Sequence, residues 1–131
     1  MILIDTNILI RLLTNSPIHQ VDKIKRFLDK NSQDLYVSSL VILETYQVLT
    51  GKIYQMDHKY AAQSILELVF RSEIFEIEQK ILHYNTLKIL LTNKIDYTDA
   101  FLQAKSILDN AKILSFDKDF NNLKPNQRIK I

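Results

Sequence analysis

The sequence predicts an α/β fold of three layers, in which helices cover both faces of a mainly parallel sheet. Short apolar runs alternate along the chain with stretches of helical periodicity, and strands separated by helices pair in parallel through right-handed crossovers. With 47% hydrophobic and 24% charged residues, the composition excludes a disordered chain, and the 131 residues suit a single domain over 1–131. The pattern does not give the order of the strands.

The elements follow from the local pattern. Short apolar runs predict strands at 2–4, 35–38, 74–77, 112–116 and 128–131. Helical periodicity predicts helices at 8–13, 18–30, 40–49, 59–70, 79–91 and 98–110. Ser38 or Ser39 suits the N-cap of the third helix. Apolar stripes mark the core-facing sides of the helices at 18–30 and 98–110: Val21, Ile24, Phe27 and Leu28 in the former, and Ala100, Ala104, Ile107, Leu108 and Ala111 at and just after the latter.

The composition excludes several classes of protein. The absence of cysteine excludes disulfides, zinc–thiolate sites and thiol nucleophiles, and it fits a cytoplasmic protein. A single glycine excludes glycine-rich phosphate loops. No apolar run approaches the roughly 18 residues of a membrane span, so no membrane association is expected. The net charge of +2 does not by itself identify a nucleic-acid partner.

Two acidic residues directly follow predicted strands. Asp5 ends the apolar run at 2–4, and Asp117 comes just after the run at 112–116. Ligands of open α/β sheets bind beyond the carboxyl ends of the strands. If both strands belong to one parallel sheet, Asp5 and Asp117 lie on the same rim, which makes both of them candidate functional residues.

Two further acids stand out, each with a structural alternative. Glu44 lies among aliphatic residues on a helix, where a carboxylate needs a cationic partner or an open side of the helix. Asp99 lies in the first turn of a helix that Asp96 or Thr98 could cap, where acids suit the helix dipole. On the functional interpretation, both acids face the rim that carries Asp5 and Asp117.

Four acids on one rim repel each other unless a cation neutralises them. Oxygen ligands favour hard cations, so the residues predict Mg²⁺ or Mn²⁺ rather than zinc or copper. His19, His58 and His83 lack metal-ligand spacing and are expected to be surface or incidental residues. Carboxylates that hold one or two hard cations are a common apparatus for phosphodiester hydrolysis.

Four motifs in this order resemble the PIN domain family: Asp5-Thr6-Asn7, Glu44, Asp96-Tyr97-x-Asp99-Ala100 and Ser115-Phe116-Asp117-Lys118-Asp119-Phe120. The resemblance covers essentially the whole chain. The chain length and the opening MILIDTNILI are similar to those of the VapC-type toxins within that family.

The resemblance implies a metal-dependent endoribonuclease with a parallel sheet of about five strands. It implies Asp5, Glu44, Asp99 and Asp117 as catalytic and metal-binding residues with Mg²⁺ or Mn²⁺, and Asn7, Asp96, Ser115 and Asp119 as supporting residues. It also implies a homodimer, an RNA substrate and a cognate antitoxin protein, as in a type II toxin–antitoxin pair. Tyr97 stands where the family often has Phe, and Ser115 where it often has Thr.

Candidate contact residues can be named for both partners. For RNA they are the cations Arg11, Lys52, Lys105, Lys118 and Lys124 and the aromatic residues Tyr46, Tyr54 and Tyr97. For an amphipathic antitoxin helix they are Ile53, Tyr54 and Met56. Ordinary surface charge and ordinary packing are the alternative interpretations of these residues.

Two other function classes remain open. One is a scaffold that binds RNA or protein without cutting, although the full set of acids argues against it. The other is an aspartate-based phosphotransferase, which usually has a second Asp two residues after the first, where this chain has Asn7. A nucleophilic Asp would form a trappable acyl-phosphate, whereas a metal-only nuclease would not.

Overall fold

A computed structural model describes residues 1–31 and 34–131 and confirms the α/β class. Its strands are β1 (Ile2–Leu3), β2 (Leu35–Val37), β3 (Glu76–Ile77), β4 (Ile113–Leu114) and β5 (Arg128–Ile129). Its helices are α1 (Thr6–Thr14), α2 (Ile18–Lys30), α3 (Ser39–Thr50), α4 (His58–Ile65), α5 (Lys80–Leu90) and α6 (Tyr97–Asp109). A π-helical turn, η1 (Leu66–Phe70), continues α4, and a 3-10 helix, η2 (Lys118–Asn122), follows β4.

Local signals set the ends of the helices close to the predicted positions. The Ser38 side chain accepts a hydrogen bond from the backbone N–H of Val41, which confirms it as the N-cap of α3. Asn15 and Asn110 adopt the left-handed conformation directly after α1 and α6, where a residue that tolerates positive φ ends a helix.

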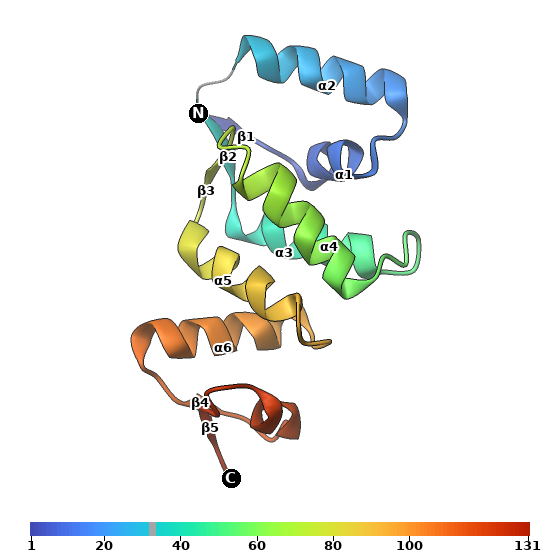
Figure 1. The fold of residues 1–131 in the computed structure, drawn as a ribbon. Coiled ribbons are helices and arrows are strands. Elements are labelled where there is room, and N and C mark those ends of the chain that lie inside the picture. Colours follow the sequence, from blue (N-terminus) through green and yellow to red (C-terminus); the bar gives the residue numbers. More distant parts are fainter. Residues whose placement is uncertain (32–33) are drawn as a thin grey trace.

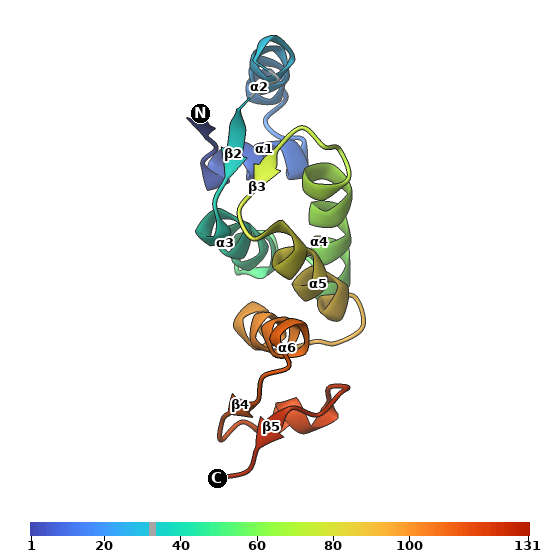
Figure 2. The same cartoon turned by 90° about the vertical axis from the view of Figure 1, so that its left-hand side faces the viewer.

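The strands form two parallel sheets instead of the expected single sheet. The first has the order β1-β2-β3, with Ile2 opposite Leu35 and Tyr36 opposite Glu76; the second pairs β4 with β5. Within the described residues, β1 and β4 do not pair. Figures 1 and 2 show the first sheet near the N-terminus, with β4 and β5 beyond α6 at the other end of the molecule.

Side-chain packing explains why β4 and β5 lie apart from the first sheet. The main core is built from the first sheet and helices α1 to α6. A smaller core of Ile113, Phe120 and Leu123 packs instead against Ile89 and Ile95, at the end of α5 and in the following loop. The Gln103 side chain also donates a 2.7 Å hydrogen bond to the carbonyl of Pro125. The C-terminal strands are therefore fixed to α5 and α6.

The predicted apolar stripes are only partly buried. On α2, Val21 and Leu28 are buried, but Phe27 is 48% exposed. On α6, the structure buries Ala100 and Ala104 but leaves Ile107 and Leu108 exposed, and it buries the polar Gln103 and Ser106 instead. Because α6 faces the C-terminal strands as well as α5, its buried side differs from the stripe that periodicity predicted.

Among the helices that the structure describes, none has the length and apolar character needed to cross a membrane.

Candidate active site

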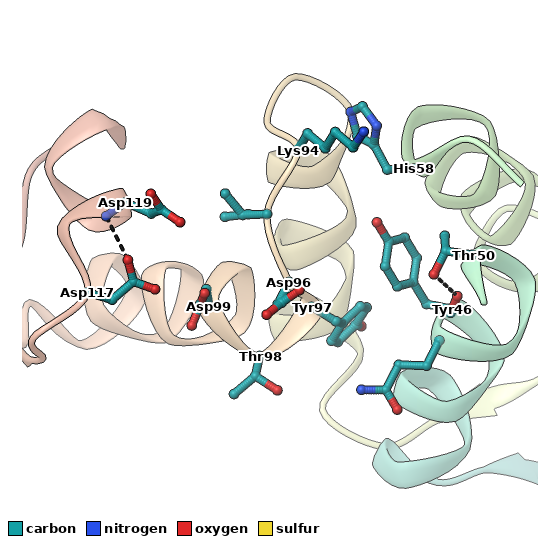
Figure 3. Close-up of a pocket in the computed structure, with 12 residues that line it drawn as sticks. Tyr46, Thr50, His58, Lys94, Asp96, Tyr97, Thr98, Asp99, Asp117 and Asp119 are labelled. Carbon is teal, nitrogen blue, oxygen red and sulfur yellow. Dashed lines mark hydrogen bonds between the residues drawn. The ribbon is translucent and has the colours of Figure 1, made fainter. Parts of the chain in front are cut away.

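A cavity of about 580 Å³ lies between the start of α6, the end of α3 and the start of α4. Figure 3 shows Asp96 just before α6 and Asp99 on its first turn, with Asp117 and Asp119 beside them from the segment after β4. The opposite side carries Tyr46 and Thr50 of α3, His58 of α4, and Lys94. Two of the four predicted catalytic acids, Asp99 and Asp117, therefore line a single cavity with both predicted supporting acids, Asp96 and Asp119.

Local hydrogen bonds fix the turn that carries Asp117. The Ser115 Oγ accepts a 2.9 Å hydrogen bond from the backbone N–H of Asp117. The Asp117 carboxylate in turn accepts one of 2.8 Å from the N–H of Asp119, which caps η2. One Asp117 oxygen is held by this cap, and the Asp117 backbone is held by Ser115.

Asp96 precedes α6, but its side chain does not cap the helix. The structure records no side-chain capping hydrogen bond at this helix start, which lies wholly in the described part of the chain. The capping alternative for Asp96 is therefore wrong, and its exposed carboxylate is available to the cavity. Asp99 is half-buried in the first turn of the same helix.

The cavity gathers negative charge around Asp99. The pKa of Asp99 is raised above its ordinary value, first by burial and then by the negative charges of Asp117, Asp96 and Asp119. In residues 1–31 and 34–131, the side-chain ion pairs leave all four of these acids without a Lys or Arg partner. Their mutual repulsion is thus not compensated within the chain.

Asp5 and Glu44 form a separate group near the end of β1. Glu44 lies on the exposed side of α3, where its carboxylate accepts a 3.0 Å hydrogen bond from the hydroxyl of Thr6. Asp5 is exposed just before α1, and no side-chain cap is recorded for this described helix. Because Thr6 directly follows Asp5, this hydrogen bond places Glu44 close to Asp5.

The four candidate catalytic acids are consequently divided between two places. Neither Asp5 nor Glu44 lines the cavity that holds Asp99 and Asp117. Across the described residues, no group of three or more His, Asp or Glu side chains is arranged to hold a metal ion. The oxygen donors suit Mg²⁺ or Mn²⁺ chemically, but the arrangement within one copy of the chain does not fit such an ion.

Asn7 is the supporting residue for which the structure gives no contact to the acids. It is exposed in the first turn of α1 and lines a shallow apolar pocket with Arg11 and Ile24. Among the recorded hydrogen bonds of the described residues, none joins its side chain to an acid. Its orienting role remains a prediction.

Sequence reasoning missed the role of His83. Expected at the surface, it is 2% exposed and links three helices. Its Nδ1 lies 2.6 Å from the Tyr97 hydroxyl, and its Nε2 contacts Ser39. Burial, opposed by the charge of Glu78, lowers the pKa of His83 to about 4. The neutral ring therefore fixes Tyr97, and with it the start of α6, against α3 and α5.

For two of the three aromatic candidates for RNA stacking, the structure supports the packing alternative. Tyr46 and Tyr97 are buried, with ring centroids 5.3 Å apart, and they pack α3 against the start of α6. Tyr54 is 38% exposed and keeps a free surface. Lys94 and His58, which the sequence did not single out, supply basic groups on the wall opposite the acids. The position of Lys94, two residues before Asp96, is the feature of the sequence that could have indicated its place in this cavity.

Carboxylates clustered after a strand and at the start of a helix of an α/β fold are typical of hydrolases that act on phosphodiester bonds with metal ions. A sequence profile of the PIN domain matches residues 2–124, and the chain therefore belongs to the PIN domain family, whose members are generally nucleases. Comparison with curated protein sequences and with solved structures gave no match.

Proposed function

We propose that the protein is a Mg²⁺- or Mn²⁺-dependent endoribonuclease that hydrolyses phosphodiester bonds in single-stranded regions of RNA. The observation that carries the proposal is the uncompensated group of Asp96, Asp99, Asp117 and Asp119 in a cavity of a PIN domain. Lys94 on the facing wall suits an RNA phosphate. Asp5, Glu44, Asp99 and Asp117 are the proposed catalytic and metal-binding residues, with Ser115, Asn7, Asp96 and Asp119 in support.

Cleavage of a panel of single-stranded and structured RNAs tests this function. We expect cuts in single-stranded regions with Mg²⁺ or Mn²⁺, none with excess chelator, and at least a hundredfold slower cleavage by Asp5→Asn and Asp117→Asn, a loss of about 2.7 kcal/mol in transition-state stabilisation. Asp109→Asn is the matched control, because Asp109 pairs with Lys105 at the far end of α6. Full activity of Asp5→Asn, or cleavage that survives chelation, contradicts the proposal.

The second candidate function is a scaffold that binds RNA or protein without cutting it. The absence of a three-acid group suited to a metal, across the described part of one copy, favours this alternative. Thermal unfolding with and without Mn²⁺ separates the two, because a bound ion stabilises the folded state by about 2.7 kcal/mol at a hundred times its Kd. A nuclease should gain Tm with Mn²⁺, and Asp117→Asn should lose that gain; a scaffold should show neither.

We further propose that this nuclease is the toxin of a type II toxin–antitoxin pair and forms a homodimer. The connection between α3 and α4 supports a protein partner, because Ile53 is 86% exposed there and Tyr54 is 38% exposed. Co-expression with the product of the adjoining gene, followed by pull-down, tests it. Copurification that Ile53→Asp abolishes supports the antitoxin; failure to copurify removes the toxin assignment and leaves the nuclease in place.

A further inference from the structure

The strands β1 and β4 each lie at the edge of a sheet. β1 pairs with β2 on one side, and β4 pairs with β5 on one side; in the described structure neither has a strand on its other side. Such edges are templates for pairing with another strand. Both edges are apolar and exposed, with Leu3 71% and Leu114 66% exposed.

The backbone amides of the two edges are free at matching positions. The N–H groups of Ile2 and Ile4 donate to Asp34 and Tyr36 on β2, at 2.7 and 2.9 Å. Successive residues of a strand direct their amides to opposite sides, so the N–H and C=O of Leu3 face the bare edge. Ile113 donates to Gln127 on β5 at 2.8 Å, so the amide of Leu114 likewise faces the bare edge of β4.

The uncovered side chains are also complementary. Each strand has one covered and one bare face: Ile4 is buried while Leu3 is exposed, and Ile113 is buried while Leu114 is exposed. In a parallel pair that uses both free amides, Leu3 comes opposite Ile113 and Ile4 opposite Leu114. In this register the exposed Leu3 lies beside the buried Ile113, and the exposed Leu114 lies beside the buried Ile4.

The same two edges carry the two separated groups of acids. Asp5 directly follows the β1 run, next to the Thr6–Glu44 hydrogen bond. Asp117 follows β4 and lies with Asp99 in the cavity. Parallel strands place their carboxyl ends at one rim, so pairing of β1 with β4 brings all four acids together.

We propose that β4 of one copy of the chain pairs in parallel with β1 of a second copy. The pairing is reciprocal and makes a dimer with two composite sites, each built from Asp5 and Glu44 of one copy and from Asp99 and Asp117 of the other. Each sheet then has the order β3-β2-β1-β4-β5. The composite site rests on the proposed nuclease function; the strand pairing does not.

The shape of the molecule selects a second copy as the occupant of each edge. β1 and β4 lie toward opposite ends of an elongated chain, with α3, α5 and α6 between them (Figures 1 and 2). The small core holds β4 against the end of its own α5 and the loop that follows. Two copies related by a twofold axis across the long direction bring each β4 to the other β1, so that the assembly closes and neither β1 nor β4 keeps an open edge.

Mixing two inactive variants tests the composite site. Asp5→Asn alone and Asp117→Asn alone each damage both sites of their own dimer. After they are unfolded and refolded together, a mixed dimer contains one intact site, so random pairing restores about one quarter of the wild-type RNA cleavage. The matched control mixes Asp5→Asn with Glu44→Gln, which lie in the same half and restore nothing. Restoration in the first mixture alone supports the proposal.

Light scattering tests the strand pairing independently of activity. Leu114→Pro removes the N–H that faces the bare edge, whereas the β4–β5 ladder uses the amide of Ile113. We expect the wild-type chain to have twice the monomer mass and Leu114→Pro to have the monomer mass with an unchanged circular dichroism spectrum. Leu114→Ala keeps the N–H and should remain a dimer.

The outcomes separate the two proposals. If the wild-type enzyme is active but the mixture of Asp5→Asn with Asp117→Asn stays inactive, the composite site is overturned, because each site is then complete within one chain. A Leu114→Pro protein that keeps the dimer mass, or a wild-type chain that is monomeric at the concentration of the cleavage assay, overturns the strand pairing. An inactive wild-type dimer that Leu114→Pro dissociates rejects the nuclease function and retains the pairing.

Discussion

The hydroxyl of Tyr97 lies 2.6 Å from Nδ1 of the buried His83, and this contact joins the start of α6 to the first turn of α5. The remaining contacts assign the protons. Ser39 donates to Gln79 at 2.7 Å, so Nε2–H of His83 donates to Ser39, and its Nδ1 accepts from Tyr97. The neutral imidazole is the form that satisfies this chain of hydrogen bonds, which ends beside the helix turn that carries Asp96 and Asp99.

The buried His83 makes the stability of the fold depend on pH. Its folded pKa of about 4 lies below the ordinary value of 6.5, so the unfolded chain binds a proton first as the pH falls. Stability is complete above pH 6.5 and is lost as the pH falls toward 4, by about 3 kcal/mol at about 1.4 kcal/mol per pKa unit. Urea unfolding at pH 4 to 7 measures this slope, which His83→Gln should reduce; an unchanged slope rejects the assignment to His83.

Replacing Tyr97 by Phe keeps the ring but removes the hydroxyl. It leaves the buried Nδ1 of His83 without its donor, and we expect a loss of about 1–3 kcal/mol in the free energy of unfolding. Tyr46→Phe is the matched control, because no hydrogen bond of the Tyr46 hydroxyl is recorded in the described structure. Urea denaturation compares the two variants; equal losses show that the Tyr97 hydroxyl adds no stability.

Ser115 holds the backbone of Asp117 by a hydrogen bond, although Ser115 itself does not line the cavity. Ser115→Ala removes the acceptor of the Asp117 N–H and should slow RNA cleavage about tenfold, the effect expected when a supporting hydrogen bond in a metal site is lost. Its Tm should change little, because the turn is solvent-exposed. Ser64→Ala removes a helix hydroxyl on α4 that donates to the Tyr60 carbonyl and serves as the control. Equal cleavage by wild type and Ser115→Ala removes this role.

Phe120 holds the C-terminal strands to the rest of the molecule. It is 2% exposed in a small core with Ile113 and Leu123, so Phe120→Ala should cost about 3–5 kcal/mol in that core. Hydrogen exchange should show faster exchange in β4 and β5, while the amides of α3 and α5 stay protected. Phe27→Ala, at a half-exposed site on α2, should leave β4 and β5 unchanged. Uniform loss of protection would show that the small core does not unfold separately.

The sequence by itself determined the elements and the family. Helix periodicity and capping are local properties, so the predicted segments recur within a few residues, as Ser38 illustrates at the start of α3. The four acidic motifs identified the PIN domain, which the family match over 2–124 confirms. Asp5 and Asp117 were recognisable from their places after strands, because those places depend only on nearby residues, whereas Glu44 and Asp99 were selected through the resemblance to the family.

Tertiary structure decided which of these elements meet. Strand pairing depends on contacts between distant residues, and the side chains of Ile113 and Phe120 hold β4 against the end of α5 and the following loop rather than beside β1. For the same reason the structure separates Asp5 from Asp117, although both follow strands. The burial of His83 was also undetermined, because a lone histidine in a helix shows no sign of the Tyr97 hydroxyl that packing brings to it.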